Sequence, residues 1–207
     1  MNIFATSPCP VKSAEILDDK RVIKMILESA QILYTNMYEM SPSSFTKAPY
    51  SPLVKLKDND NNFIGYKQNV KVKYAYYLAG ERVYAPTHLN HPSTIWARES
   101  RANYIWLLEH FEALCNEYTN RYGKVHKCYQ HYGNLDYGIH HIPQGTFTEI
   151  PKCMPDEFKT DDVYESYQLY LINKWQNDEK SPTWYREYMN NKEIFMMLDE
   201  LDEVAYA

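Results

Sequence analysis

The sequence contains no apolar run that approaches the ~18 residues of a membrane-spanning helix. Its first ten residues, MNIFATSPCP, lack the basic segment and the long apolar segment of a secretory signal. No CxxC pair is formed by its four cysteines, which are Cys9, Cys115, Cys128 and Cys153. These absences predict a protein of the reducing cytoplasm that has no membrane partner.

Positive charge is also scarce. Twenty-two lysines and arginines stand against 27 acidic residues, and the formal net charge is −5. A protein that binds nucleic acid through its overall field is usually basic. Any DNA contact is therefore expected to come from a local basic patch.

Tyrosine, in contrast, is abundant, with 20 residues, and aromatic residues make up 15% of the chain. Tyr and Trp combine a flat apolar ring with a polar tip, which suits surfaces that stack bases. An AT-rich genome, whose codons favour Tyr, Asn, Lys and Ile, explains the same count equally well. The aromatic content therefore permits a nucleic-acid interface without requiring one.

Hydrophobic periodicity predicts an all-α, mainly helical fold. One helical stretch runs from about 11 to 38 with a bend near Asp18-Asp19, and another spans 91–124 and divides at Ser100. Further helices are expected at 161–175 and 192–204. We expect one compact domain, 1–207, with long irregular connections and a core that joins helix 19–37 to helix 101–122.

Residues 41–85 interrupt this pattern. Ser41-Pro42, Pro49, Pro52 and the polar run DNDNN predict a loop-rich insertion, with room for one small β-hairpin around Leu53–Ile64. The segment VKVKYAYYL, 70–78, alternates at first and fits a strand or the start of a helix.

The segment LDDKRVIKMILESAQIL, 17–33, is apolar around most of the circumference of a helix. This apolar arc includes Ile23 and Leu27. A narrow polar wedge contains Lys20, Lys24, Glu28, Gln31 and Thr35. An amine beside a carboxylate is the minimum for imine chemistry, because the amine attacks a carbon while the carboxylate moves protons. The same Lys–Glu spacing also occurs in exposed surface pairs worth a few tenths of a kcal/mol. Spacing alone leaves both interpretations open.

Two clusters combine aromatic and basic side chains. The first contains Trp96, Arg98, Arg101, Tyr104 and Trp106, and Arg121, Lys124 and Lys127 follow at the helix end. The second, in SPTWYREY, contains Trp184, Tyr185, Arg186 and Tyr188. Such clusters can grip phosphates and stack on bases. Alternatively, the tryptophans belong to the core, the arginines pair with Glu99 and Glu109, and the second cluster fastens a tail to the body.

Histidines and cysteines gather around HKCYQH, 126–131. A zinc site there would need a fourth ligand from His140, His141 or Cys153, and the spacing matches no zinc motif. We therefore expect no metal and no other cofactor, although the spacing leaves metal binding by this cluster open.

Several of these segments resemble, in the same order, the pyrimidine-dimer DNA glycosylases of the phage endonuclease V type. SPTWYREY is similar to the family's C-terminal PTWY segment, which lies at the DNA. NYIWLLEHFEALCNEYTNRYGK resembles a helix with paired aromatics, a Leu-rich middle, a Cys and an Arg-Gly-type end, and NHPS resembles an Asn-His-Pro start of cellular relatives. SAEILDDKRVIKMILESA resembles the first helix, and it also resembles uncharacterised phage proteins with a DKH-type helix, where Arg21 takes the His position.

The resemblance implies a small helical enzyme that acts without a metal on double-stranded DNA with a damaged or modified pyrimidine. When Asp19 is placed on the Asp of the family's first helix, Glu28 falls on the catalytic glutamate. The family's arginines near that glutamate are not matched, because Leu27 and Gln31 stand about where they would fall. We expect a monomer that is found in the host cytoplasm if it is encoded by a phage.

The nucleophile that the resemblance implies is the α-amine of the second residue after removal of Met1. Because Asn2 is a poor substrate for that removal, the candidates are the amines of Asn2, Met1, Lys20 and Lys24. The expected DNA-binding residues are Lys20, Arg21, Arg98, Arg101, Trp184, Tyr185, Arg186 and Tyr188.

The sequence thus predicts a DNA glycosylase, with AP-lyase strand cleavage left open. Two alternatives stay beside it. One is a phage enzyme that modifies a base or a free nucleotide on the same scaffold. The other is a non-enzymatic anti-defence or host-takeover protein that binds its partner through a Tyr-rich surface.

Overall fold

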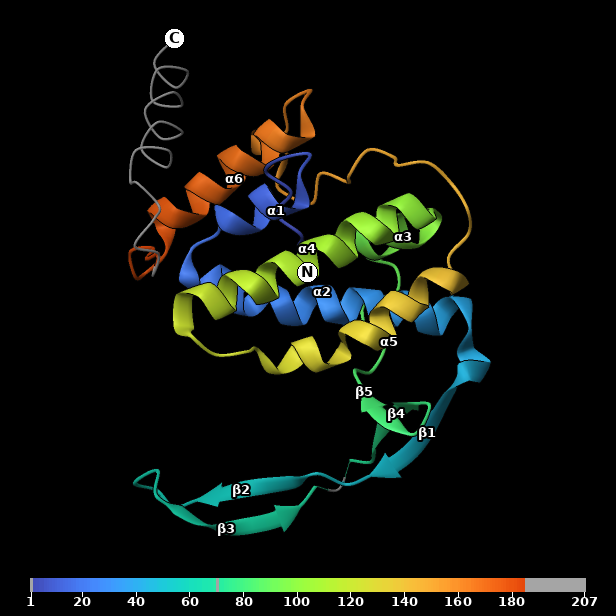
Figure 1. Ribbon diagram of the computed structural model, residues 1–207. Helices are drawn as coiled ribbons and strands as arrows, with labels where there is room; N and C mark the ends of the chain where they lie inside the picture. The colour runs from blue at the N-terminus through green and yellow to red at the C-terminus, as the bar shows by residue number, and fades with distance from the viewer. Residues whose placement is uncertain (1, 70, 185–207) are drawn as a thin grey trace.

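Helices form the body of the molecule (Figure 1). The computed structural model describes residues 2–69 and 71–184. Within these ranges the helices are α1 (Pro10–Glu15), α2 (Asp19–Met40), α3 (Pro92–Glu99), α4 (Arg101–Tyr122), α5 (Tyr132–Tyr137) and α6 (Val163–Asn177). None of them is both long enough and apolar enough to cross a bilayer. The mainly helical prediction is confirmed, and the helix expected at 192–204 lies outside the described residues.

The all-α prediction needs correction in one segment, because the described residues of 41–85 contain five strands. One antiparallel sheet has the order β1-β4-β5, formed by β1 (Phe45–Tyr50), β4 (Lys73–Leu78) and β5 (Glu81–Val83). A separate hairpin pairs β2 (Leu53–Lys57) with β3 (Phe63–Gln68). The hairpin was expected, but β1 was not. Pro49 is compatible with β1 because β1 is an edge strand, where a residue without an N–H breaks no ladder.

The long helices α2 and α4 lie against each other, as predicted, with α1 across α4 and α3 beside both (Figure 1). Ile26, Leu33, Leu107 and Phe111 on these two helices are fully buried. The predicted division at Ser100 is confirmed, because the Ser100 hydroxyl accepts a hydrogen bond from Asn103 N at 3.1 Å and caps α4. These contacts set α2 and α4 as the frame for the remaining elements.

The apolar arc of α2 is narrower than its sequence predicts. Ile23 and Leu27 are 43% and 38% exposed. At the other end, Thr35 is buried, and its hydroxyl oxygen accepts a hydrogen bond from Thr87 N at 3.0 Å. The connection that leads into α3 therefore covers the C-terminal part of the wedge, whereas the part around Glu28 faces outward.

The N-terminal segment is threaded into the core. Ile3 and Ala5 are fully buried and Phe4 is 7% exposed. Phe4 has a φ of 45° and stacks on Tyr170 of α6, with ring centroids 6.0 Å apart. Since a left-handed φ is costly for a bulky residue, the packing around Phe4 must hold this conformation. The position of the adjacent residue, Asn2, is set in this way.

A buried ion-pair network closes the other end of the body. The fully buried Arg121 side chain donates from Nη1 to Asp19 Oδ1 at 2.9 Å and from Nε to Glu117 Oε1 at 2.8 Å. The other Asp19 oxygen accepts a hydrogen bond from the Thr183 hydroxyl at 2.8 Å. Arg121, considered above as a phosphate ligand, thus forms its ion pairs inside the protein and is not accessible to a phosphate.

Removal of this guanidinium should be strongly destabilising. We expect Arg121→Met to lower the free energy of unfolding by about 3–5 kcal/mol, because Asp19 and Glu117 would stay buried without their cation. Urea denaturation measures the change. The control is Lys124→Met, an exposed lysine nearby, whose effect should stay within about 0.5 kcal/mol. Equal, small effects of both substitutions would contradict a structural role for the network.

His110 of α4 is buried and neutral. Its Nδ1 donates to the Pro10 carbonyl of α1 at 2.9 Å, and its ring stacks on Trp106. Burial lowers the pKa of His110 from 6.5 to about 4. The unfolded chain therefore binds this proton first as the pH falls, and the contribution of His110 to stability is complete above pH 6.5 and lost towards pH 4.

His110→Asn should flatten the pH dependence of stability. The substitution keeps a short polar group near Pro10 but removes the titration. Across the window from pH 6.5 to 4 the wild-type free energy of unfolding should fall by roughly 3 kcal/mol more than that of the variant. Urea titrations at several pH values measure the difference. Parallel curves for the two proteins would show that His110 is protonated equally in the folded and unfolded chains.

Candidate active site

The Glu28 carboxylate on α2 meets two nitrogen atoms. Its Oε2 accepts a hydrogen bond from the backbone N of Asn2 at 3.2 Å, and its Oε1 lies 3.3 Å from Lys24 Nζ. The Glu28 side chain is only 16% exposed, whereas that of Lys24 is 68% exposed. Two of the candidate amine positions therefore converge on one carboxylate. Lys20 does not join them, because its Nζ pairs with Asp178 at 3.3 Å.

The side chain of Asn2 fixes the direction of its backbone N. Its Nδ2 donates to the Cys153 carbonyl at 2.9 Å, and its Oδ1 accepts from Phe4 N at 2.9 Å. Ile3, next in the chain, is fully buried. The residue is thus anchored on both sides, and its backbone N is held at the Glu28 carboxylate.

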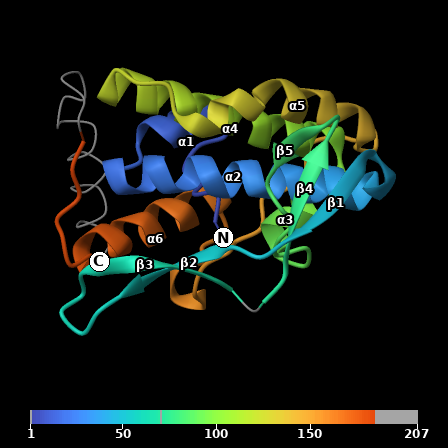
Figure 2. The ribbon, with the colours of Figure 1, turned by 90° about the horizontal axis from the view of Figure 1, so that it is seen from below.

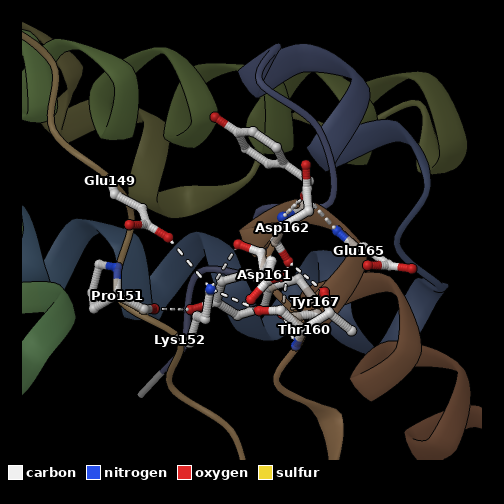
Figure 3. A network of polar contacts seen from close by, with 10 residues as sticks. Glu149, Pro151, Lys152, Thr160, Asp161, Asp162, Glu165 and Tyr167 are labelled. Atoms are coloured by element: carbon white, nitrogen blue, oxygen red, sulfur yellow. Dashed lines mark hydrogen bonds and ion pairs between the residues drawn. The ribbon is translucent and has the colours of Figure 1, made fainter.

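The segment that carries Cys153 is itself braced by a polar network (Figure 3). Lys152 Nζ donates to the carbonyls of Thr160 and Asp161 at 2.8 and 3.0 Å and pairs with Glu149 at 3.4 Å. From α6, the Tyr167 hydroxyl donates to the Pro151 carbonyl at 2.7 Å. These contacts make 149–153 a firm support behind Asn2.

His91, at the start of α3, lies in the electrostatic field of Glu28. Burial lowers the pKa of His91, and the negative charge of Glu28 opposes that shift. The Nδ1 of His91 accepts a hydrogen bond from Ser93 N at 3.2 Å, and Ser93 Oγ lies 3.3 Å from Cys153 Sγ. His91 and Cys153 were not among the predicted site residues, although the NHPS motif pointed to this region.

Two of the expected DNA-binding residues lie at the start of α2. Lys20 is 67% exposed at its side chain. Arg21 is 7% exposed and forms ion pairs with Asp18 at 2.7 Å and with Asp178 at 3.1 Å. A phosphate contact by Arg21 would require these largely buried pairs to break, whereas Lys20 would exchange only its exposed pair with Asp178 for a phosphate.

The aromatic and basic cluster of α3 and α4 is largely internal. Trp96 and Trp106 are buried and meet edge to face, as the core interpretation predicted. The half-buried Arg98 and Arg101 donate to backbone carbonyls, those of Leu89 at 2.8 Å and Ile142 at 3.4 Å. In the described ranges neither arginine pairs with Glu99 or Glu109, so that part of the alternative interpretation is wrong.

The SPTWYREY segment docks on the helical body at its beginning. Trp184 lies against Trp175, with ring centroids 5.1 Å apart, and its indole N–H donates to the Ile16 carbonyl at 3.0 Å. Trp184 is half-buried, so one part of its ring packs on the core and another meets solvent. Tyr185, Arg186 and Tyr188 lie outside the described residues.

The histidines and cysteines of 126–153 are spread over several contacts. Cys128 forms a hydrogen bond with the Tyr84 hydroxyl at 3.0 Å, and His131 Nδ1 forms one with the Tyr34 hydroxyl at 3.1 Å. Over residues 2–69 and 71–184, no group of three or more His, Cys, Asp or Glu side chains is arranged to hold a metal ion.

A comparison with known families places this geometry in context. The family model described as pyrimidine dimer DNA glycosylase matches residues 1–130, which is more than half of the chain. No curated protein and no solved structure gives a significant match. The matched range contains α1 to α4, and with them both partners of the contact between Asn2 and Glu28. The chain therefore belongs to the pyrimidine dimer DNA glycosylase family.

Proposed function

We propose that this protein is a DNA glycosylase that removes a damaged or modified pyrimidine from double-stranded DNA. An N-terminal amine is its nucleophile, and Glu28 is its acid–base group. The observation that carries the proposal is the 3.2 Å hydrogen bond between Asn2 N and Glu28 Oε2. Membership of the family supports the reaction class.

The nucleophile is best supplied by an α-amine. An α-amino group titrates at about 7.7–8.0 and a lysine at about 10.4, so the α-amine is far more often neutral near pH 7. Removal of Met1 would convert Asn2 N into such an amine at its present position beside Glu28. The amines of Met1, which lies outside the described residues, and of Lys24 are the alternatives.

The reaction follows from these two groups. The amine nitrogen forms a bond to C1′ of the target deoxyribose as the glycosidic bond breaks, and the bonding electrons leave with the base, which takes up a proton. Glu28 stabilises the positive charge that develops on the sugar and accepts a proton from the attacking amine. Opening of the sugar ring then gives an imine. Hydrolysis of the imine leaves an abasic site, whereas loss of a C2′ proton and of the 3′ phosphate cleaves the strand.

Access to C1′ requires the duplex to be kinked or the base to be flipped out. Ile23 and Leu27 are exposed on the same helix as Glu28, and apolar side chains can wedge between base steps. Lys20 and Lys24 are exposed on this face and can exchange their ion pairs with Asp178 and Glu28 for phosphates. We retain Arg21, Arg98, Arg101, Trp184, Tyr185, Arg186 and Tyr188 as proposed DNA contacts.

Glu28→Gln should abolish base release while duplex binding is nearly retained. The substitution keeps the shape and hydrogen bonding of the side chain but removes its charge, and we expect a loss of at least about 100-fold in single-turnover rate. Base release from an ultraviolet-irradiated duplex and gel-shift titration measure the two quantities. The matched control is Glu39→Gln, an exposed glutamate on the same helix, which should keep wild-type activity. Full activity of Glu28→Gln would end the proposal.

Borohydride reduction should trap a covalent protein–DNA adduct at the N-terminal residue. Intact mass spectrometry first establishes whether Met1 is present, and peptide mapping then locates the adduct. An uncleaved N-terminal tag should prevent trapping, and its removal should restore it, whereas Lys24→Gln should still form the adduct. An adduct at Lys24 would keep the imine chemistry but reject the N-terminal amine. Absence of any adduct on dimer, abasic and modified-base duplexes would favour a base-modifying enzyme or a non-enzymatic binding protein.

A further inference from the structure

A β-hairpin stands apart from the helical body in Figure 1, and seen from below it runs in front of that body (Figure 2). None of the contacts of the site described above involves it. This arm consists of β2 and β3, residues 53–68, and β1 and β4 lead into and out of it. Its apolar side chains are turned to solvent: Leu53, Phe63, Ile64 and Tyr66 are 66%, 56%, 63% and 56% exposed. A two-stranded hairpin is marginally stable by itself, and exposed apolar surface of this kind marks an interaction site.

The arm and the segments that connect it to the body carry a net positive charge, although the whole chain is acidic. Residues 45–74 contain six lysines and two aspartates, whereas the whole chain has a net charge of −5. One of the two aspartates, Asp58, is used by the hairpin turn, where its carboxylate accepts hydrogen bonds from the backbone N of Asp60 and of Asn62. Across the described ranges, Lys55, Lys57 and Lys67 have no ion pair with a carboxylate. Their positive charge is therefore available to a partner.

The register of the arm places lysines opposite apolar side chains. Lys55 faces Tyr66 across the hairpin, Lys67 faces Val54, and Lys57 faces Phe63. Directly opposed residues lie on the same face of a sheet, so each lysine stands beside an apolar or aromatic group. Phe63 and Tyr66 themselves meet edge to face at 5.0 Å. The arm thus combines cations for phosphates with rings and methyl groups for sugars and bases.

We infer that the arm is a second DNA-binding element, which holds the duplex outside the region attacked at Glu28. The major groove, about 12 Å wide, admits a two-stranded β-ribbon. A strand of six residues is about 20 Å long, enough to follow roughly six nucleotides along the duplex. Charge density favours duplex DNA over a second copy of this chain, because a duplex carries one negative charge per about 1.7 Å of its axis, whereas the chain spreads a net charge of −5 over 207 residues. The inference rests on the proposed function only in its choice of partner.

Salt-dependent binding to an undamaged 30-base-pair duplex tests the arm. The variant K55Q/K57Q/K67Q should show a shallower dependence of log K on log salt, by about 2.7, because three phosphate contacts are lost at roughly 0.9 each. The control variant K12Q/K159Q/K180Q changes the net charge equally at exposed lysines outside the arm and should keep the wild-type slope. All six positions are exposed, and thermal melting checks that both variants are folded. Equal slopes for the two variants would overturn the inference.

Acetylation of lysines in the wild-type protein supplies an independent measurement. Mass spectrometry should show that the duplex protects Lys55, Lys57 and Lys67 and leaves Lys12 reactive. Unchanged reactivity of the arm, or loss of a dimer in K55Q/K57Q/K67Q with no change in salt slope, would instead assign the arm to a protein partner and overturn the inference. These assays need no chemistry on the base. If the protein forms no imine but its DNA binding depends on the arm, the proposed function is refuted and the inference about the arm stands.

Discussion

The buried ion pair between Asp19 and Arg121 is the constraint on which the rest of the structure depends. It joins the first residue of α2 to the last turn of α4, 102 positions apart, and Arg121 also donates to the Glu15 carbonyl at the end of α1. Asp19 also accepts a hydrogen bond from the hydroxyl of Thr183. Buried ion pairs add little net stability when their desolvation is counted, but a single unpaired partner is costly. The network therefore specifies one arrangement of α1, α2 and α4, and with it the orientation of the helix that carries Glu28.

The candidate site depends on a second constraint, the burial of the chain's first residues. Residues 3–5 are part of the core, and the φ of Phe4 is sustained by packing that involves α6. Asn2 is held by the Cys153 carbonyl, 151 positions away, on a segment that Lys152 and Tyr167 brace. The proposed nucleophile lies near the end of the chain, where a residue would ordinarily be mobile. Here its position is coupled to the folding of the whole body, which holds the backbone N of Asn2 against the Glu28 carboxylate.

In our proposals, the catalytic chemistry and the attraction of DNA are assigned to different parts of this molecule. The face around Glu28 offers few free cations, since Arg21 already forms ion pairs with Asp18 and Asp178. In the part of the chain that the structure describes, the six lysines of residues 45–74 form no ion pair with a carboxylate, and the arm within this segment stands apart from the helical body (Figure 1). Such a division lets an acidic protein bind a polyanion, because a local positive field acts within about a Debye length and does not need a positive total.

Local signals in the sequence determined where most helices begin and end and which carboxylate to examine. The cap at Ser100 acts within one turn of chain, and the nine-residue spacing from Asp19 to Glu28 is a property of one helix. Periodicity could not say how much of the α2 surface its neighbours would cover, so the exposure of Leu27 was missed. Prolines at 49 and 52 suggested loop, because nothing local shows that a strand will lie at a sheet edge. The contact of Asn2 with Glu28 was decided by the tertiary structure alone, because it joins residues whose approach depends on the packing of every element between them.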